Sequence, residues 1–156
     1  MNARQWTISM MVAAMAVALV APLGGCASSG PSPDVMPEGG TYSGLWYSPQ
    51  YEHMYLHQDG DRVEGVYTYR AGGTIEGTVE GNMLLFSWHQ PGDRGAAQRA
   101  VNGKGYFHLI SEGEEVDLVG QWGYNDDRSG APWEAELIRE IEDKDPRTLE
   151  DLERRR

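Results

Sequence analysis

A glycine followed two residues later by a large apolar side chain recurs along the chain. The pairs are Gly44 with Trp46, Gly65 with Tyr67, Gly77 with Val79, Gly105 with Phe107, and Gly120 with Trp122. Because residues two apart in a β-strand point to the same face, each glycine shares a face with its large partner. Glycine weakens a strand unless the sheet bends there or another backbone approaches closely. Repeated pairs of this kind therefore predict a strongly curved sheet.

Alternation of apolar and polar residues with a period of two predicts a series of short strands. They are expected at residues 45–47, 53–58, 62–70, 73–80, 83–89, 104–111, 116–124 and 133–139. Tight turns are predicted at Asp59-Gly60 and Gly81-Asn82, because hairpin turns need a residue with positive φ. Residues 91–102 form the one long connection expected between strands.

The two faces of these strands differ in polarity. The side chains expected to face inward are apolar: Trp46, Met54, Leu56, Val63, Tyr67, Tyr69, Ile75, Val79, Leu84, Phe86, Trp88, Phe107, Leu109, Leu118, Trp122, Trp133, Ala135 and Leu137. The opposite face is expected to be mostly polar and to hold Glu64, Thr68, Arg70, Thr74, Glu76, Thr78, Ser87, His89, Lys104, His108, Asp117, Gln121, Glu134 and Glu136. Apolar exceptions on that face are Leu85, Tyr106, Ile110 and Val119.

This pattern predicts an all-β domain over residues 42–140, an eight-stranded antiparallel up-and-down meander that forms a closed or nearly closed barrel. A flat sheet of this length would leave two edge strands exposed. The interior of an eight-stranded barrel is either filled by side chains or holds one small ligand. The inward aromatic residues admit both interpretations, a packed core or the wall of an apolar ligand site: Trp46, Tyr67, Tyr69, Trp88, Phe107, Trp122 and Trp133.

Buried tyrosine and tryptophan side chains need hydrogen-bond partners, and we expect Gln58 and Gln121 to supply some of them. Apolar residues on every strand, with few inward polar groups, favour a packed core.

The N-terminal segment has the features of a targeting signal. Arg4 is the only charge before an apolar run over residues 6–22, and the run ends in Leu23-Gly24-Gly25-Cys26. This ending resembles the lipobox of bacterial lipoproteins. The resemblance implies that residues 1–25 are a signal peptide, that Cys26 becomes the first residue and carries a diglyceride, and that its amine carries a further acyl chain such as palmitate. Two acyl anchors already suffice for stable membrane attachment.

The flanking segments are expected to be appendages. Residues 26–41 are rich in small residues, proline and glycine and predict a flexible tether. Because Ala27 is not aspartate, the resemblance to lipoproteins implies an outer-membrane location, with the protein facing the periplasm or the cell surface. Residues 141–156 form a charged tail, in which Asp145-Pro146 is typical of a helix start.

Charge and motifs exclude several function classes. The chain has 24 acidic and 13 basic residues, a formal net charge of −11, which argues against nucleic acid as a partner. Its only cysteine, Cys26, is taken by the anchor. His53 and His57 lie on one strand about 13 Å apart, too far to share a metal ion. We therefore expect no enzyme activity, cofactor or metal, and we interpret the acidic segment at residues 125–130 as a solvated turn.

The start of the domain resembles two families of barrel proteins. Trp46-Tyr47, the turn at Asp59-Gly60 and Gly65-x-Tyr67 resemble the opening of the avidins, and Gly44-Leu45-Trp46 is also similar to the lipocalins. Ser48 stands where avidins carry the asparagine that binds biotin, so we do not extend the resemblance to that ligand.

Three functional hypotheses follow from these features. The first is a lipid-anchored envelope protein with a small β-barrel that serves as a binding or structural module, without catalysis. The second is a lipocalin- or avidin-like carrier of a small apolar ligand. The third is a periplasmic hydrolase inhibitor, whose partner would be another envelope protein.

Overall fold

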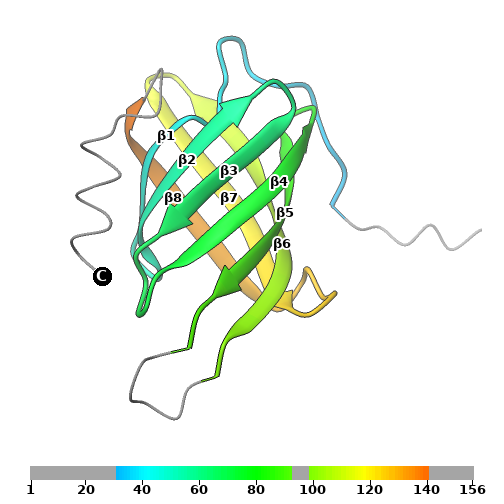
Figure 1. The fold of residues 1–156 in the computed structure, drawn as a ribbon. Coiled ribbons are helices and arrows are strands. Elements are labelled where there is room, and N and C mark those ends of the chain that lie inside the picture. The colour runs from blue at the N-terminus through cyan, green and yellow to red at the C-terminus, as the bar shows by residue number, and fades with distance from the viewer. Residues whose placement is uncertain (1–30, 93–98, 141–156) are drawn as a thin grey trace, which may run out of the picture. The chain divides into compact units, whose positions relative to one another are not determined.

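The computed structural model describes residues 31–92 and 99–140. The expected signal peptide at residues 1–25, Cys26 and the charged tail at 141–156 lie outside the described residues. The described part of the chain forms one antiparallel sheet closed into a barrel, in which each strand pairs with its neighbours in sequence (Figure 1). The strands are β1 (Gly44–Ser48), β2 (Glu52–Asp59), β3 (Arg62–Tyr67), β4 (Gly73–Glu80), β5 (Met83–Gln90), β6 (Val101–Glu112), β7 (Glu115–Tyr124) and β8 (Ala131–Glu140).

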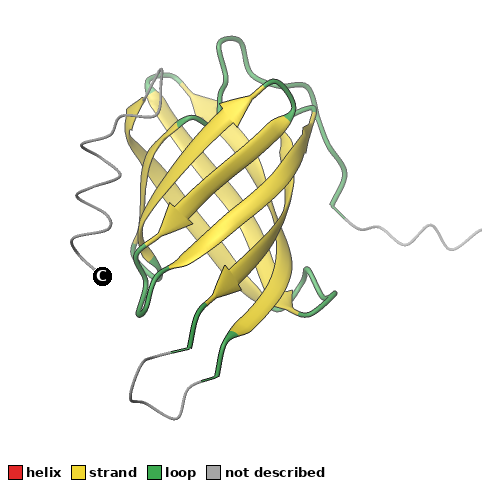
Figure 2. Cartoon of the chain, in the orientation of Figure 1, coloured by secondary structure: helices red, strands yellow, loops and turns green. Residues whose placement is uncertain are grey.

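The barrel is closed by pairing between the first and last strands. Gly44 pairs with Glu140 and Trp46 with Leu137, and the register shifts between Leu45 and Trp46. The prediction of an eight-stranded all-β barrel is therefore confirmed, and the closure is complete. Strands and loops make up the described residues, as Figure 2 shows, and no helix among them is long and apolar enough to cross a membrane.

The inward glycines mark the places where the sheet bends most. A Cβ at Gly105 would meet the ring of Phe86 on the neighbouring strand. At Gly120 a Cβ would overlap the backbone carbonyl of Tyr106. The close approach predicted from the sequence is confirmed at these positions, because an inward ring occupies the space at Gly105 and the backbone of β6 occupies the space at Gly120.

Most side chains expected to face inward form the core. Among them Trp46, Leu56, Ile75, Leu84, Phe107, Leu109 and Leu118 are 0% exposed. On the outer face, Tyr55 is also buried and packs with Leu45 and Val66. His53 and His57 are partly exposed, and the His53 ring lies 5.2 Å from that of Tyr47.

One end of the barrel is covered by the segment that precedes β1 (blue in Figure 1). Tyr42 is fully buried there, and its hydroxyl donates to the carbonyl oxygen of Asn82 at 2.7 Å, with that of Phe107 at 3.1 Å. The backbone N–H of Asp34 donates to Asn82 Oδ1 (2.8 Å), and the N–H of Asn82 donates back to the Asp34 carbonyl (2.9 Å). The expected tether at 26–41 therefore contacts the barrel from Asp34 onward.

The largest differences from the predicted strand boundaries lie at the opposite end of the barrel, in β3 and in the hairpin of β5 and β6. β3 ends at Tyr67, not at Arg70, because Arg70 has a φ of 58° and Gly72 a φ of 71°, which turn the chain into β4. β5 and β6 extend to Gln90 and Val101, so the long connection spans residues 91–100. Both changes move side chains to this end of the barrel.

Candidate functional site

The open end of the barrel holds a cavity of about 280 Å³. The connections at residues 49–51, 68–72 and 125–130 lie at this end of the barrel, which is the lower end of Figure 1. The cavity is lined by Tyr51, Tyr67, Tyr69, Arg70, Trp88, Gln90, Val101, Trp122, Tyr124 and Trp133. Seven of these ten lining residues are aromatic, so the walls favour a flat apolar ligand.

Edge-to-face contacts hold the aromatic walls together. The Tyr51 ring, from the β1–β2 connection, lies 5.3 Å from Tyr69 and 5.9 Å from Trp122, both nearly perpendicular. Trp88 lies 5.2 Å from Trp122 in the same geometry. Such pairs add about 0.5–1.5 kcal/mol each beyond the burial of apolar area. The walls are therefore set before any ligand arrives.

The aromatic residues singled out from the sequence fall into two groups. Trp46 and Phe107 are fully buried in the filled half of the barrel. Tyr67, Tyr69, Trp88, Trp122 and Trp133 line the cavity. Trp133 also contacts Phe107, at 5.3 Å between ring centroids, so its indole separates the cavity from the packed core. The packed-core interpretation therefore describes Trp46 and Phe107, and the ligand-site interpretation describes the other aromatic residues of this set.

The hydrogen-bond partners of the indole groups are mostly backbone carbonyls. Trp46 Nε1 donates to the Tyr42 carbonyl (3.0 Å) and Trp88 Nε1 to that of Gly123 (3.2 Å). Trp122 Nε1 donates to the hydroxyl of Tyr51 (2.8 Å). The expectation that Gln58 serves these groups is wrong, because its amide oxygen accepts from the backbone N–H of Tyr42 and its amide donates to the Gly60 carbonyl.

Six lining residues carry polar groups that find no hydrogen-bond or ion-pair partner among the described residues: the hydroxyls of Tyr67, Tyr69 and Tyr124, the amide of Gln90, the guanidinium of Arg70 and the Nε1 of Trp133. Tyr67 is 4% exposed and Gln90 is 8% exposed. Burial raises the pKa of the Tyr67 hydroxyl above its usual range, and the neighbouring Tyr124 raises this pKa further. The Tyr67 hydroxyl is therefore protonated near neutral pH and available as a donor.

Arg70 lies at the rim of this cavity. Its guanidinium stands over the Tyr69 ring at 5.0 Å from the centroid, a cation–π contact. We expected Arg70 on the outer face, but the alternation from which we inferred that position ends with β3 at Tyr67.

The backbone is strained beside three of the lining tyrosines. Glu52, Arg70 and Asn125 have φ values of 62°, 58° and 57°, and they follow Tyr51, Tyr69 and Tyr124 directly. A left-handed conformation costs a residue other than glycine roughly 1–2 kcal/mol, with less for asparagine. Such strain gathers at ligand sites, where the surrounding structure imposes it. Tyr51, Gln90 and Tyr124 were not identified from the sequence, and the only signal was their position beside turns.

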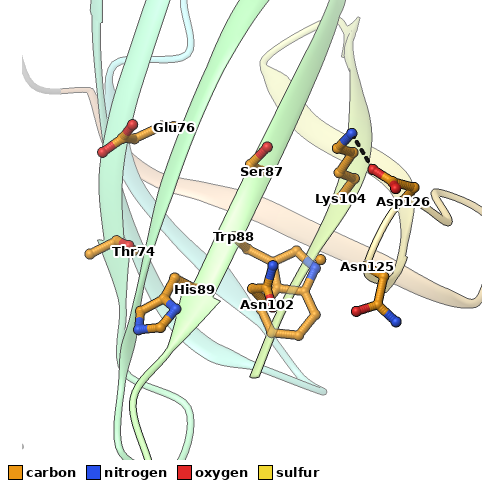
Figure 3. A pocket seen from close by; sticks show the side chains of 10 residues that line it. Thr74, Glu76, Ser87, Trp88, His89, Asn102, Lys104, Asn125 and Asp126 are labelled. Carbon is orange, nitrogen blue, oxygen red and sulfur yellow. Dashed lines mark hydrogen bonds and ion pairs between the residues drawn. The ribbon is translucent and has the colours of Figure 1, made fainter. Parts of the chain in front are cut away.

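A larger depression, about 530 Å³, lies on the outer face of β4, β5 and β6 (Figure 3). Its rim consists of polar side chains of both signs, and Lys104 and Asp126 form an ion pair across it. Lys104 lowers the pKa of the Asp126 carboxyl, by its hydrogen bond and by its charge. Thr74 lies opposite His89, and Glu76 opposite Ser87, on the paired strands β4 and β5 (Figure 3). Because its lining is mostly polar, this depression offers a ligand less apolar contact than the aromatic cavity does.

The β7–β8 connection, at residues 125–130, is organised by its own hydrogen bonds. Asp127 Oδ1 accepts from the backbone N–H and the hydroxyl of Ser129, both at 2.9 Å. These bonds lower the pKa of the Asp127 carboxyl. Across residues 31–92 and 99–140, no cluster of three histidine, cysteine, aspartate or glutamate side chains is positioned to hold a metal ion.

The fold and the cavity define a small closed β-barrel with one covered end and one open, aromatic-lined end. The chain matches no protein-family model, no curated protein and no solved structure.

Proposed function

We propose that this protein is a lipid-anchored envelope protein whose barrel binds a small, planar, apolar molecule at its open end. The observation that carries the proposal is the division of the interior. One half is filled by fully buried side chains, whereas aromatic rings surround a cavity of about 280 Å³ in the other. Ligand pockets typically measure about 300–1,000 Å³, so this cavity suits a molecule of one or two fused rings. Lipocalins and streptavidin use the interior of eight-stranded barrels in the same way.

The lining residues support binding without catalysis. General acid–base and nucleophilic catalysis most often rely on carboxylate, histidine, lysine, cysteine or activated serine groups, and less often on tyrosine. Tyrosine is the only one of these residue types among the described residues that line the cavity. The lining instead has the composition of a recognition site, with aromatic walls and a few polar groups.

The proposed anchor is compatible with an accessible cavity. The chain reaches β1 across the covered end of the barrel, where Tyr42 and Asp34 contact Asn82. Cys26 precedes Asp34 by eight positions, so a lipid on Cys26 would tether the protein by that end. A ligand could then enter from the side away from the attachment.

Anchoring predicts a specific effect of Cys26→Ala. We expect the wild-type chain in the membrane fraction, with an acylated N-terminal Cys26 and without residues 1–25, because the thioether lipid is the proposed attachment. The Cys26→Ala chain should carry no acyl group. It should also no longer be found in the membrane fraction as the form that lacks residues 1–25. Mass spectrometry of fractionated cells measures both. An unacylated wild-type chain that retains residues 1–25 would contradict the anchor.

Binding can be tested with 1-naphthamide as a neutral planar probe, using ¹⁵N-labelled protein that begins after the anchor. We expect the indole N–H signals of Trp88 and Trp122 to shift on titration while that of Trp46 stays in place. Trp122→Leu should weaken binding about tenfold or more, because it removes a wall and the partner of the Tyr51 hydroxyl.

Tyr106→Leu is the matched control, since it removes an aromatic ring from the outer face of the neighbouring strand β6 and should leave the affinity unchanged. A titration in which no indole signal moves would reject the cavity as a binding site. The hypotheses of a structural module or a hydrolase inhibitor would then replace the hypothesis of ligand binding.

A further inference from the structure

Two of the polar groups in the cavity lie on the two strands that flank β4, Tyr67 on β3 and Gln90 on β5. Tyr67 pairs with Gly73 of β4, and a Cβ on Gly73 would collide with the Tyr67 ring and hydroxyl. Thr74, next along β4, pairs with His89 of β5, the neighbour of Gln90. The Tyr67 side chain therefore leans across the space that Gly73 leaves empty, on the way toward the position of Gln90.

These groups have no hydrogen-bond partner among the described residues. Tyr67 and Gln90 are each more than nine-tenths buried, line the cavity and make no hydrogen bond within the described part of the chain. Their polar atoms are open to the cavity, whereas Trp133 Nε1 is the described lining atom that is fully buried without a partner. A ligand that supplies a hydrogen-bond acceptor would take the place of water at these groups. The arrangement thus selects a ligand with a polar end as well as an apolar body.

The charge around the cavity gives the sign of that polar end. Arg70 is the only charged residue among the described residues that line it, although the whole chain carries a net charge of −11. The Arg70 guanidinium forms no ion pair among the described residues and is held over the Tyr69 ring. An arginine fixed in this way presents its donors in a planar array that matches a carboxylate.

The position of Arg70 at the rim limits the cost of binding an anion. A fully buried charge would lose its hydration, and pairing often fails to compensate for that loss. Arg70 is exposed to solvent, so an anionic group beside it would stay partly hydrated while the apolar body enters between the rings. Aromatic walls, donors deeper inside and a cation at the entrance therefore form one composite site.

We propose that the natural ligand is a small aromatic acid: a planar body of one or two rings that bears one carboxylate or similar anion, with the anion bound by Arg70 and the donors of Tyr67 and Gln90. This inference rests on the proposed function and adds the chemical class of the ligand. It also accounts for an arginine, and no acidic residue, among the described residues that line the cavity of an acidic protein.

The test compares two probes of nearly the same shape, 1-naphthoate and 1-naphthamide, by calorimetry at pH 7 and low salt. We expect 1-naphthoate to bind at least about tenfold more tightly than 1-naphthamide, because hydrogen bonds to a charged group are the stronger kind. The preference should shrink as salt is added, since screening weakens the ion pair.

Arg70→Gln should reduce the preference to less than about threefold with little change in 1-naphthamide affinity. Arg62→Gln is the matched control, because it removes the same charge from the opposite end of β3, and it should keep the preference. Tyr67→Phe keeps the ring and removes only the hydroxyl, and it should weaken 1-naphthoate more than 1-naphthamide. The ratio of the two affinities is informative because a merely structural disturbance would affect both probes alike.

The outcomes separate this inference from the function on which it rests. If both probes bind equally well and Arg70→Gln leaves their ratio unchanged, the anionic class is wrong while the aromatic cavity remains a binding site. If neither probe binds, the proposed binding function itself fails. If Arg62→Gln abolishes the preference for 1-naphthoate as fully as Arg70→Gln does, the preference arises from net charge. That result would overturn the proposal of a specific anion site at Arg70.

Discussion

Gly120→Ala is expected to lower the free energy of unfolding of the barrel by about 3 kcal/mol or more, enough to prevent folding of a marginally stable domain. The added Cβ would overlap the carbonyl oxygen of Tyr106 and approach the Tyr106 carbonyl carbon to 2.8 Å and the Cα of Phe107 to 3.0 Å. These are backbone atoms of β6, which pairs with β7 at Phe107 and Gly120. No rotamer change relieves such a contact, so the β6–β7 pairing itself must shift.

Gly113→Ala provides the control for this prediction. Gly113 lies in the β6–β7 turn with a φ of 68°, and a Cβ there would have no heavy atom within 4 Å. The substitution should cost only the roughly 1–2 kcal/mol of a left-handed alanine. Urea unfolding of both variants, followed by tryptophan fluorescence, measures the difference. Equal destabilisation would show that sheet curvature does not depend on the space at Gly120.

The strands and their faces could be predicted because they depend on local alternation. The Gly-x-large pairs added the curvature, because a glycine and a ring two residues apart must share a face. Closure had no comparable local signal, since the pairing of Gly44 with Glu140 joins the two ends of the domain. The sequence therefore predicted a curved meander, and long-range pairing decided that it closes.

The ends of the barrel were predicted less well, for a physical reason. Tyr42 and Tyr51 lie in connections, where no alternation indicates which side chains turn inward. Tyr42 is nevertheless fully buried and hydrogen-bonded to β-strand and turn carbonyls. At the open end, the positive φ of Arg70 changes the direction of the chain, so extending the alternation beyond Tyr67 placed Arg70 on the wrong face.

The sequence predicted the aromatic character of the candidate site but not which aromatic residues line the cavity. The aromatic residues were identified, but whether each belongs to the core or to a cavity depends on its height in the barrel. Trp46 lies beneath the covering Tyr42, whose carbonyl accepts its indole N–H. Trp122 lies near the other end, where its indole binds the hydroxyl of Tyr51. Only the three-dimensional register separates these two environments.

Above pH 10, the stability of the barrel is expected to fall steeply. Burial raises the pKa of the Tyr42 and Tyr67 hydroxyls above their usual value, whereas both ionise near pH 10 in the unfolded chain. Above that pH the folded state holds more protons than the unfolded state, so stability decreases as pH rises. Each tyrosine contributes up to about 1.4 kcal/mol per pH unit, and the two together contribute about 2.7 kcal/mol per unit.

Urea unfolding of the wild-type protein, Tyr42→Phe and Tyr67→Phe between pH 8 and pH 11.5 measures this dependence. Below pH 9 the three curves should be parallel, because the hydroxyls are protonated in both states. Above pH 10 each substitution should remove about half of the excess slope, whereas the repulsion general to an acidic chain is common to all three proteins.

Tyr67→Phe is the more informative of the two variants. The Tyr42 hydroxyl donates to the Asn82 carbonyl, so its loss also removes a hydrogen bond. The Tyr67 hydroxyl has no such partner among the described residues, and its loss changes little except the titration. A Tyr67→Phe protein with an unchanged alkaline slope would mean that water reaches this hydroxyl freely in the folded barrel. The unsatisfied donor on which the proposed acid-binding site depends would then not exist.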